Sequence, residues 1–182
     1  AVSEETSSIE DKTGAAVLAA NAGDAKEQPA KVEFVSMDFA YAGSSENALS
    51  QISFQAMRGQ TIGIIGGTGS GKSTLVNLIP RFYDATGGMV LVDGVNVKDM
   101  PLQALREKIG IVPQKAVLFK GTLRDNIRWG KPDATDEEIY HALEIAQARD
   151  FVDSKDEGLD LMIQQGGKNL SGGQKQRLCI AR

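Results

Sequence analysis

The sequence predicts an α/β protein in which short apolar strands alternate with helices. Residues 60–66 form a short, continuous apolar run with branched side chains, which favours a buried central strand. Residues 72–79 are predicted to form a helix whose core contacts are Leu75, Val76, Leu78 and Ile79. Residues 136–148 again have helical apolar spacing, at Ile139, Leu143 and Ala146. We therefore expect an α/β core with an inserted helical segment between about residues 115 and 175.

The first 30 residues differ in composition from the rest of the chain. Residues 1–30 contain no aromatic side chain, and their six acidic and two basic residues account for the whole net charge of −4. Such a segment buries too little apolar surface to offset its ordering entropy, so it is predicted to be a flexible linker or tail. Residues 31–182 are predicted to form one domain. This domain is neutral overall, which disfavours non-specific binding to nucleic acid.

The remaining elements follow in order along the chain. Residues 31–37 and 48–57 have the loose alternation of strands, and Asp93-Gly94 between two valine-rich runs predicts a tight β-hairpin. Further expected elements are a short helix at 102–108, a short buried strand at 110–112 and a final helix starting at Ser171. The only histidine, His141, is expected on the solvent side of the helix at 136–148.

Two further observations concern the environment of the chain. Cys179 is the only cysteine, so an internal disulfide is impossible and a reducing compartment is expected. No apolar run approaches the roughly 18 residues that a membrane span requires, and we expect the chain itself to be soluble.

A glycine-rich stretch follows the apolar run at 60–66 and matches the P-loop pattern G-x-x-x-x-G-K-[ST]. Closely spaced glycines let successive backbone N–H groups turn toward one anion, and the positive end of the following helix adds to the attraction. Lys72 would reach the β- and γ-phosphates of a nucleotide, and the Ser73 hydroxyl would bind Mg²⁺. A glycine-rich turn matching by chance is the alternative, which the strand before it and the helix after it disfavour. The predicted nucleotide-binding residues are Gly66, Gly67, Thr68, Gly69, Ser70, Gly71, Lys72, Ser73 and Thr74.

A second candidate phosphate-binding end is the peptide Leu170-Ser171-Gly172-Gly173-Gln174. The S-x-x-Q spacing is that of a capping box at the start of a helix, which is a purely structural role. The two glycines of such a capped start also leave N–H groups and the helix dipole open to an anion. We expect both roles together, with Ser171, Gly172, Gly173 and Gln174 contacting a nucleotide.

With these two motifs, residues from about Val32 to Arg182 resemble the first two-thirds of an ATP-binding-cassette (ABC) nucleotide-binding domain. The resemblance implies a P-loop NTPase core with an antiparallel β subdomain and an inserted helical subdomain, incomplete at its C-terminus. It also implies ATP and Mg²⁺ as cofactors. In this family ATP lies between the P-loop of one domain and the signature peptide, here residues 170–174, of a second domain.

The resemblance assigns roles to two more residues. Tyr41 stands where the family places the aromatic residue that stacks on adenine, although an ordinary tyrosine at a strand end is the alternative. Gln114, in Ile111-Val112-Pro113-Gln114, resembles the glutamine that approaches Mg²⁺ and the attacking water. The implied catalytic residues are therefore Lys72 and Gln114, and the implied metal ligands are Ser73 and Gln114.

Residues 118–127 resemble a segment of exporter-type members, which implies the ATP-driven motor of a membrane exporter. Its implied partners are a second nucleotide-binding domain and a transmembrane domain, at the cytoplasmic face of a membrane. Residues 89–93 imitate a Walker B strand but belong to the predicted hairpin and precede Gln114. By resemblance the Walker B acid, the catalytic glutamate, the D-loop and the switch histidine belong beyond Arg182. Residues 1–182 alone are expected to bind nucleotide without hydrolysing it efficiently.

Three alternatives stay open at this point. Gln165 stands where exporters often carry a glutamate, which raises the hypothesis of a heterodimer with one weak site. A soluble ABC-type ATPase acting on ribosomes or nucleic acid would carry the same two phosphate-binding motifs. A P-loop kinase of a small molecule would explain the motif at 66–73 but not the peptide at 170–174.

Overall fold

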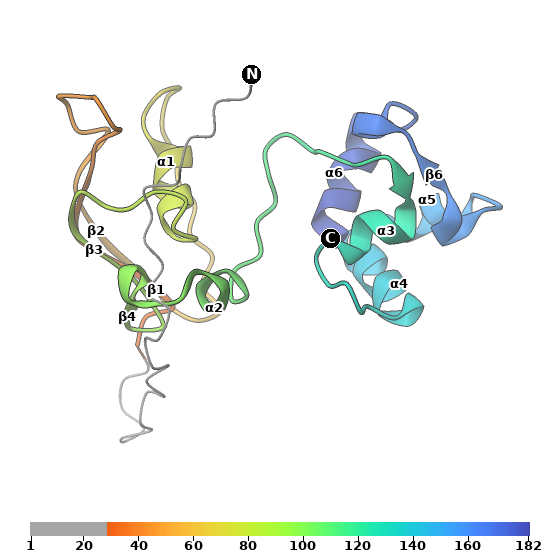
Figure 1. The fold of residues 1–182 in the computed structure, drawn as a ribbon, viewed down its shortest axis with the longest axis horizontal. Coiled ribbons are helices and arrows are strands. Elements are labelled where there is room, and N and C mark those ends of the chain that lie inside the picture. Colours follow the sequence, from red (N-terminus) through yellow and green to blue (C-terminus); the bar gives the residue numbers. More distant parts are fainter. Residues whose placement is uncertain (1–28) are drawn as a thin grey trace. The chain divides into compact units, whose positions relative to one another are not determined.

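The computed structural model describes residues 29–182, which divide into two compact units between Gly110 and Ile111 (Figure 1). The predicted linker at 1–30 lies almost entirely outside the described residues. Among the described helices, none is both long and apolar enough to cross a membrane.

The first unit is built on a four-stranded sheet in the order β2-β1-β3-β4, with every neighbouring pair antiparallel. Its strands are β1 (Val32–Phe39), β2 (Leu49–Ala56), β3 (Gly87–Val92) and β4 (Val95–Asn96). The strands predicted at 31–37 and 48–57 are confirmed to within two residues at their ends. The hairpin is also confirmed, because Asp93 and Gly94 both have positive φ (50° and 76°), as a type I′ turn requires.

One face of this sheet is covered by α1 (Lys72–Leu78), the 3-10 helix η1 (Val97–Asp99) and α2 (Leu102–Arg106). Phe34 and Met37 of β1 are almost fully buried in this core. Leu75 and Leu78 point from α1 into it as predicted, whereas Val76, also expected in the core, is exposed. The helix thus fixes the C-terminal side of the glycine-rich loop against a packed sheet.

Two predicted buried strands do not form. Residues 60–66 and 110–112 have no strand structure, and among the described residues neither pairs with the four-stranded sheet. Their apolar side chains are exposed, with Ile65 at 97% and Val112 at 48% of the accessible maximum. A strand is stabilised by hydrogen bonds to neighbouring strands and by cover on its faces, and neither is encoded in the apolar run itself.

The second unit is mainly helical, as expected of an inserted segment (Figure 1). Its core contains Ile139 and Leu143 as predicted, together with Leu178. The helix predicted at 136–148 ends earlier, because the chain turns at Gln147 with a positive φ of 55°. Its elements are β5 (Gly121–Thr122), α3 (Leu123–Arg128), α4 (Asp136–Ile145), α5 (Arg149–Asp153), η2 (Gly158–Asp160), β6 (Met162–Ile163), η3 (Gln165–Gly167) and α6 (Gly172–Ala181).

Polar contacts hold the exporter-like segment at 118–127 in place. The buried Asn126 side chain accepts a hydrogen bond from Phe119 N at 2.8 Å and donates to Phe119 O and Thr122 O at 3.0 Å. Arg124 forms a two-pronged ion pair with Asp136 at the start of α4. His141 is exposed on α4, as predicted.

Candidate functional site

The glycine-rich loop enters α1 through backbone conformations that favour glycine. Gly69 and Gly71 have φ of 81° and 84°, in the left-handed region. Gly71 is also the residue before the first turn of α1, and a Cβ there would lie 2.7 Å from Leu49 Cδ2. The loop therefore needs glycine at position 71 for its conformation and for its packing against β2.

Lys72 and Ser73, the predicted phosphate-binding lysine and magnesium ligand, stand at the start of α1. The Lys72 ammonium group folds over the loop and donates to Gly66 O at 2.8 Å and Gly67 O at 2.6 Å. The Ser73 side chain is exposed. No acidic residue lies in the first turn of α1, so nothing at this helix start repels an anion.

A cavity of about 340 Å³ lies against this loop. Tyr41, which follows the C-terminal end of β1, also lines it. The Tyr41 hydroxyl and Thr74 Oγ1 are 2.7 Å apart, so the tyrosine is hydrogen-bonded directly to α1. The structure thus brings together Tyr41 and the predicted phosphate-binding residues, which are far apart in the sequence. The lining consists of Tyr41, Ala48, Gly69, Ser70, Gly71, Lys72, Ser73 and Thr74.

The donors around this cavity suit a nucleotide with its magnesium ion. A lysine ammonium and glycine backbone N–H groups are the usual partners of phosphate, and the lining contains no carboxylate to repel it. The Ser73 hydroxyl is an oxygen ligand of the kind Mg²⁺ prefers, although one such ligand leaves most of its coordination to phosphate and water. Within residues 29–182, no cluster of three or more His, Cys, Asp or Glu side chains forms a separate metal site.

The signature peptide begins α6 with the predicted capping box. Ser171 Oγ accepts from Gln174 N at 3.2 Å, and Gln174 Oε1 accepts from Ser171 N at 2.9 Å. Gly172 and Gly173 form the first helical positions, and a Cβ on either would meet no protein atom within 4 Å. Neither packing nor backbone conformation requires glycine at these two positions, and glycine is less favourable in a helix than alanine. The two glycines thus leave open space at the start of α6 at a cost in helix propensity.

The turn before the signature peptide is fixed by Asn169. Its side chain accepts from Gln164 N at 3.0 Å and donates to Met162 O at 2.9 Å, which ties β6 to the residue before Leu170. Gln165, the position where exporters often carry glutamate, is exposed in this turn.

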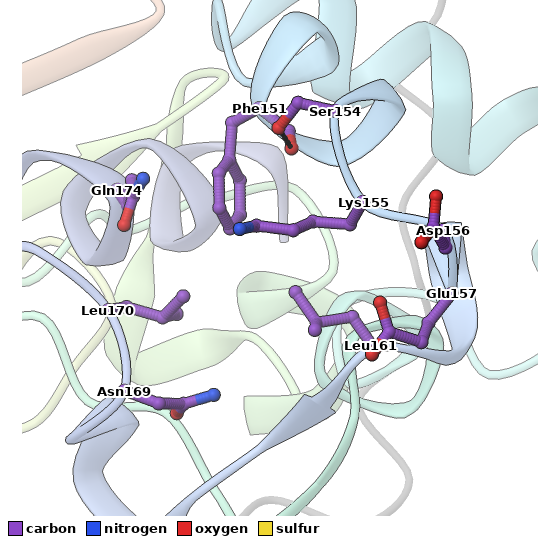
Figure 2. Close-up of a pocket in the computed structure, with 9 residues that line it drawn as sticks. All are labelled: Phe151, Ser154, Lys155, Asp156, Glu157, Leu161, Asn169, Leu170 and Gln174. Atoms are coloured by element: carbon purple, nitrogen blue, oxygen red, sulfur yellow. Dashed lines mark hydrogen bonds between the residues drawn. The ribbon is translucent and has the colours of Figure 1, made fainter.

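A second cavity, of about 420 Å³, opens beside the signature peptide in the second unit. Figure 2 shows the Lys155 side chain reaching toward the Phe151 ring, with Leu170 and Leu161 on the opposite wall. The Lys155 ammonium lies 5.9 Å from the centre of that ring. Neither Lys155 nor Phe151 belongs to a sequence motif, so no role for them could be predicted from the sequence.

Gln114 lies in an irregular segment near the start of the second unit, and its side chain is exposed. The predicted metal and catalytic roles of Gln114 stay predictions.

Asp93, from the rejected Walker B imitation, accepts hydrogen bonds from the Lys31 and Lys108 ammonium groups at 2.8 and 3.0 Å. The hydrogen bond from Lys31, followed by that from Lys108, holds the pKa of Asp93 below its usual value. The Asp93 carboxylate thus has a structural role at the hairpin turn.

Both phosphate-binding motifs fall within the stretch that matches a known family. Residues 49–182 match the family described as ABC transporter. The chain belongs to the ABC transporter family. Its fold is that of an ABC-type P-loop ATPase domain, and membership implies that it binds nucleotide.

The curated relatives of this ABC domain are exporter proteins by name. YgaD of Bacillus subtilis, which carries the name multidrug export ATP-binding/permease protein, is 48% identical over 83% of the chain. A protein of the same description from Staphylococcus aureus, SAB1799c, is 43% identical over 84% of the chain. The match spans only 26% of the length of each of these two relatives.

The structure also matches a bacterial Atm1-family ABC exporter solved with ATP bound. The TM-score is 0.79 and the sequence identity 37%, over 85% of this chain and 27% of that exporter. The family and fold inferred from the two phosphate-binding motifs are thereby confirmed.

Proposed function

We propose that this ABC domain is the ATP-binding motor of a membrane exporter and couples ATP binding and hydrolysis to transport. The observation that carries the proposal is the cavity shared by Tyr41 and the loop around Lys72, in a chain whose relatives are named as export ATP-binding/permease proteins. The resemblance of residues 118–127 to exporter-type members supports export over the soluble alternative.

Within the site, each side chain has a proposed task. The exposed ring of Tyr41 stacks on the adenine, and Lys72 exchanges its bonds to the loop carbonyls for bonds to the β- and γ-phosphates. Ser73 and Gln114 would hold Mg²⁺, which would supply positive charge to neutralise the charge that develops on the phosphates. Gln114 also orients the attacking water.

The signature peptide completes the site in a second copy or a second domain. Its open glycines admit a phosphate to the start of α6, which Ser171 and Gln174 hold in a fixed helical shape. The proposed partners are therefore a second nucleotide-binding domain and the transmembrane domain of the same transporter, with this domain at the cytoplasmic face of the membrane. Because the chain spans about a quarter of its relatives, hydrolysis and transport are proposed for the complete protein.

Binding of Mg-ATP to Lys72→Ala tests the proposal. A charge-assisted hydrogen bond contributes about 1.5–3 kcal/mol, so affinity measured by calorimetry on the complete protein should fall roughly 10- to 150-fold. ATP turnover and ATP-driven uptake into inside-out vesicles should be lost with it.

Lys131→Ala is the matched control, because Lys131 is an exposed lysine whose ion pair is with the exposed Glu138, away from the cavity lining. Unchanged ATP affinity in Lys72→Ala would contradict the nucleotide site. Association with ribosomes or RNA at physiological salt, without membrane transport, would contradict the export role and leave the nucleotide site intact.

A further inference from the structure

Tyr83 belongs to none of the motifs recognised in the sequence, yet it packs against the proposed adenine-stacking residue. It follows α1 in a connecting segment, and its ring centre lies 5.5 Å from that of Tyr41 and 5.5 Å from that of Phe39. Phe39 is 3% exposed and belongs to the sheet core, whereas Tyr83 is 39% exposed. Tyr83 therefore connects a rigid core ring to an accessible ring at the cavity.

The aromatic contacts leave part of the Tyr41 side chain exposed. The three centroid distances of 4.8, 5.5 and 5.5 Å form a nearly equilateral triangle, so Phe39 and Tyr83 approach Tyr41 from the same side. Both rings meet Tyr41 nearly at right angles, with interplanar angles of 81° and 83°. The Tyr41 side chain remains 43% exposed and lines the cavity at the loop.

The hydroxyl end of Tyr41 is held as well. Its oxygen lies 2.7 Å from Thr74 Oγ1, and Thr74 is buried at 8% exposure in the first turn of α1. The aromatic contacts fix the tilt of the ring, while the hydroxyl bond fixes its distance from the phosphate-binding loop. Removing Tyr83 would leave Phe39 as the one remaining ring of this group against Tyr41, which weakens the restraint on rotation of the Tyr41 ring about the axis through its hydroxyl.

We propose that Tyr83 is a positioning residue of the nucleotide site, which holds the plane of Tyr41 in the orientation that stacks on the nucleobase. The inference rests on the proposed function and extends it to a residue that is not among those lining the cavity at the loop. Preorganising the ring reduces the ordering cost of binding, so the effect is confined to the part of the affinity contributed by the base. An aromatic pair of this geometry corresponds to about a 3- to 10-fold change in affinity.

Comparing two ligands separates this role from a general packing role. Mg-ATP uses both Tyr41 and the phosphate-binding loop, whereas magnesium tripolyphosphate uses the loop alone. In Tyr83→Leu of the complete protein, the dissociation constant for Mg-ATP should rise about 3- to 10-fold and that for tripolyphosphate should not change. Tyr83→Phe, which keeps the ring, should restore the wild-type ATP affinity.

A double-substitution cycle with Tyr41 completes the test. In a Tyr41→Ala background, Tyr83→Leu should have no further effect on ATP affinity, because the ring that it positions is absent. Equal weakening of both ligands by Tyr83→Leu, an unchanged ATP affinity, or an undiminished effect in the Tyr41→Ala background would each overturn the inference. Tyr83→Met, which fills the same space without a ring, replaces Tyr83→Leu if the leucine variant is unfolded. Failure of the unsubstituted protein to bind ATP would instead contradict the proposed function.

Discussion

The two proposed phosphate-binding ends of this protein both contain a pair of glycines, but the two pairs have different physical roles. In the loop before α1, Gly69 and Gly71 have left-handed backbone conformations, and a side chain at position 71 would strike Leu49. In the signature peptide, Gly172 and Gly173 are helical and face open space. The first pair is needed for the backbone conformation and packing of its own unit. The second pair leaves room at the start of α6 for a ligand from outside the unit.

The two ends are also stabilised differently. The loop before α1 has no side-chain cap and is held by Lys72, whose ammonium group bonds to the loop's own carbonyls. The start of α6 has a complete capping box and needs no cation. A ligand at the first end therefore has to replace existing contacts, whereas a ligand at the second end meets a preformed helix start. Substitutions at each end should separate conformation from ligand binding.

Among the substitutions that compare the two ends, Gly173→Ala should have the largest effect, and that effect is on ATP turnover. An added methyl group at the start of α6 meets no protein atom but would occupy the space proposed for the partner's nucleotide. Turnover by the complete protein should fall on the order of 10- to 100-fold. Unfolding free energy, measured in urea, should stay the same or rise by about 0.5 kcal/mol, because alanine favours a helix more than glycine does. Normal turnover would remove the distinction between the two glycine pairs.

Gly71→Ala should act mainly on stability. Its positive φ and the contact with Leu49 together should cost about 2 kcal/mol of unfolding free energy. Gly67→Ala is the matched control in the same loop, since a Cβ there meets no atom within 4 Å and the residue has no positive φ. Equal stability of the two alanine variants in urea unfolding would contradict the conformational role of Gly71.

Ser171→Ala tests the preformed helix start. Loss of the hydroxyl that accepts from Gln174 N should lower the unfolding free energy by about 1 kcal/mol. Ser171→Asn should retain most of the stability, because asparagine is an equally good residue at this position. The comparison would fail if the alanine variant unfolded at the same urea concentration as the unsubstituted protein.

The smallest expected effect is the change in unfolding free energy at low pH. Neither proposed phosphate-binding end contains a carboxylate, so low pH should act on the scaffold through groups such as Asp93. Its lowered pKa means that its stabilising effect is present above the unfolded value of 3.8 and is lost as pH falls through the folded value. The unsubstituted protein should exceed Asp93→Asn in stability at pH 7 by less than about 1 kcal/mol, with the difference vanishing toward pH 3. If the stability difference between the two proteins persisted at pH 3, it would arise from packing at position 93 and not from the charge of Asp93.

The sequence by itself determined the features that depend on neighbouring residues. The capping box at Ser171 and the turn at Asp93-Gly94 follow from local backbone geometry, and both form as predicted. The helix expected after the glycine-rich loop forms as well, whereas the strand expected before that loop does not. The family also followed from these local motifs, because phosphate binding at a loop requires a fixed spacing of glycine, lysine and serine. The apolar faces of the helices were predicted equally well at Leu75 and Leu143.

Only the tertiary structure decided the features that join distant parts of the chain. The apolar run at 60–66 was expected to be a buried strand, but strand formation depends on partners that the run does not specify, and Ile65 is exposed. The contacts of Tyr41 with Tyr83 and Thr74 bridge long stretches of sequence, and no spacing rule predicts them. Local hydrogen bonds and φ preferences are encoded within a few residues, whereas packing is decided by whichever surfaces the folded chain brings together.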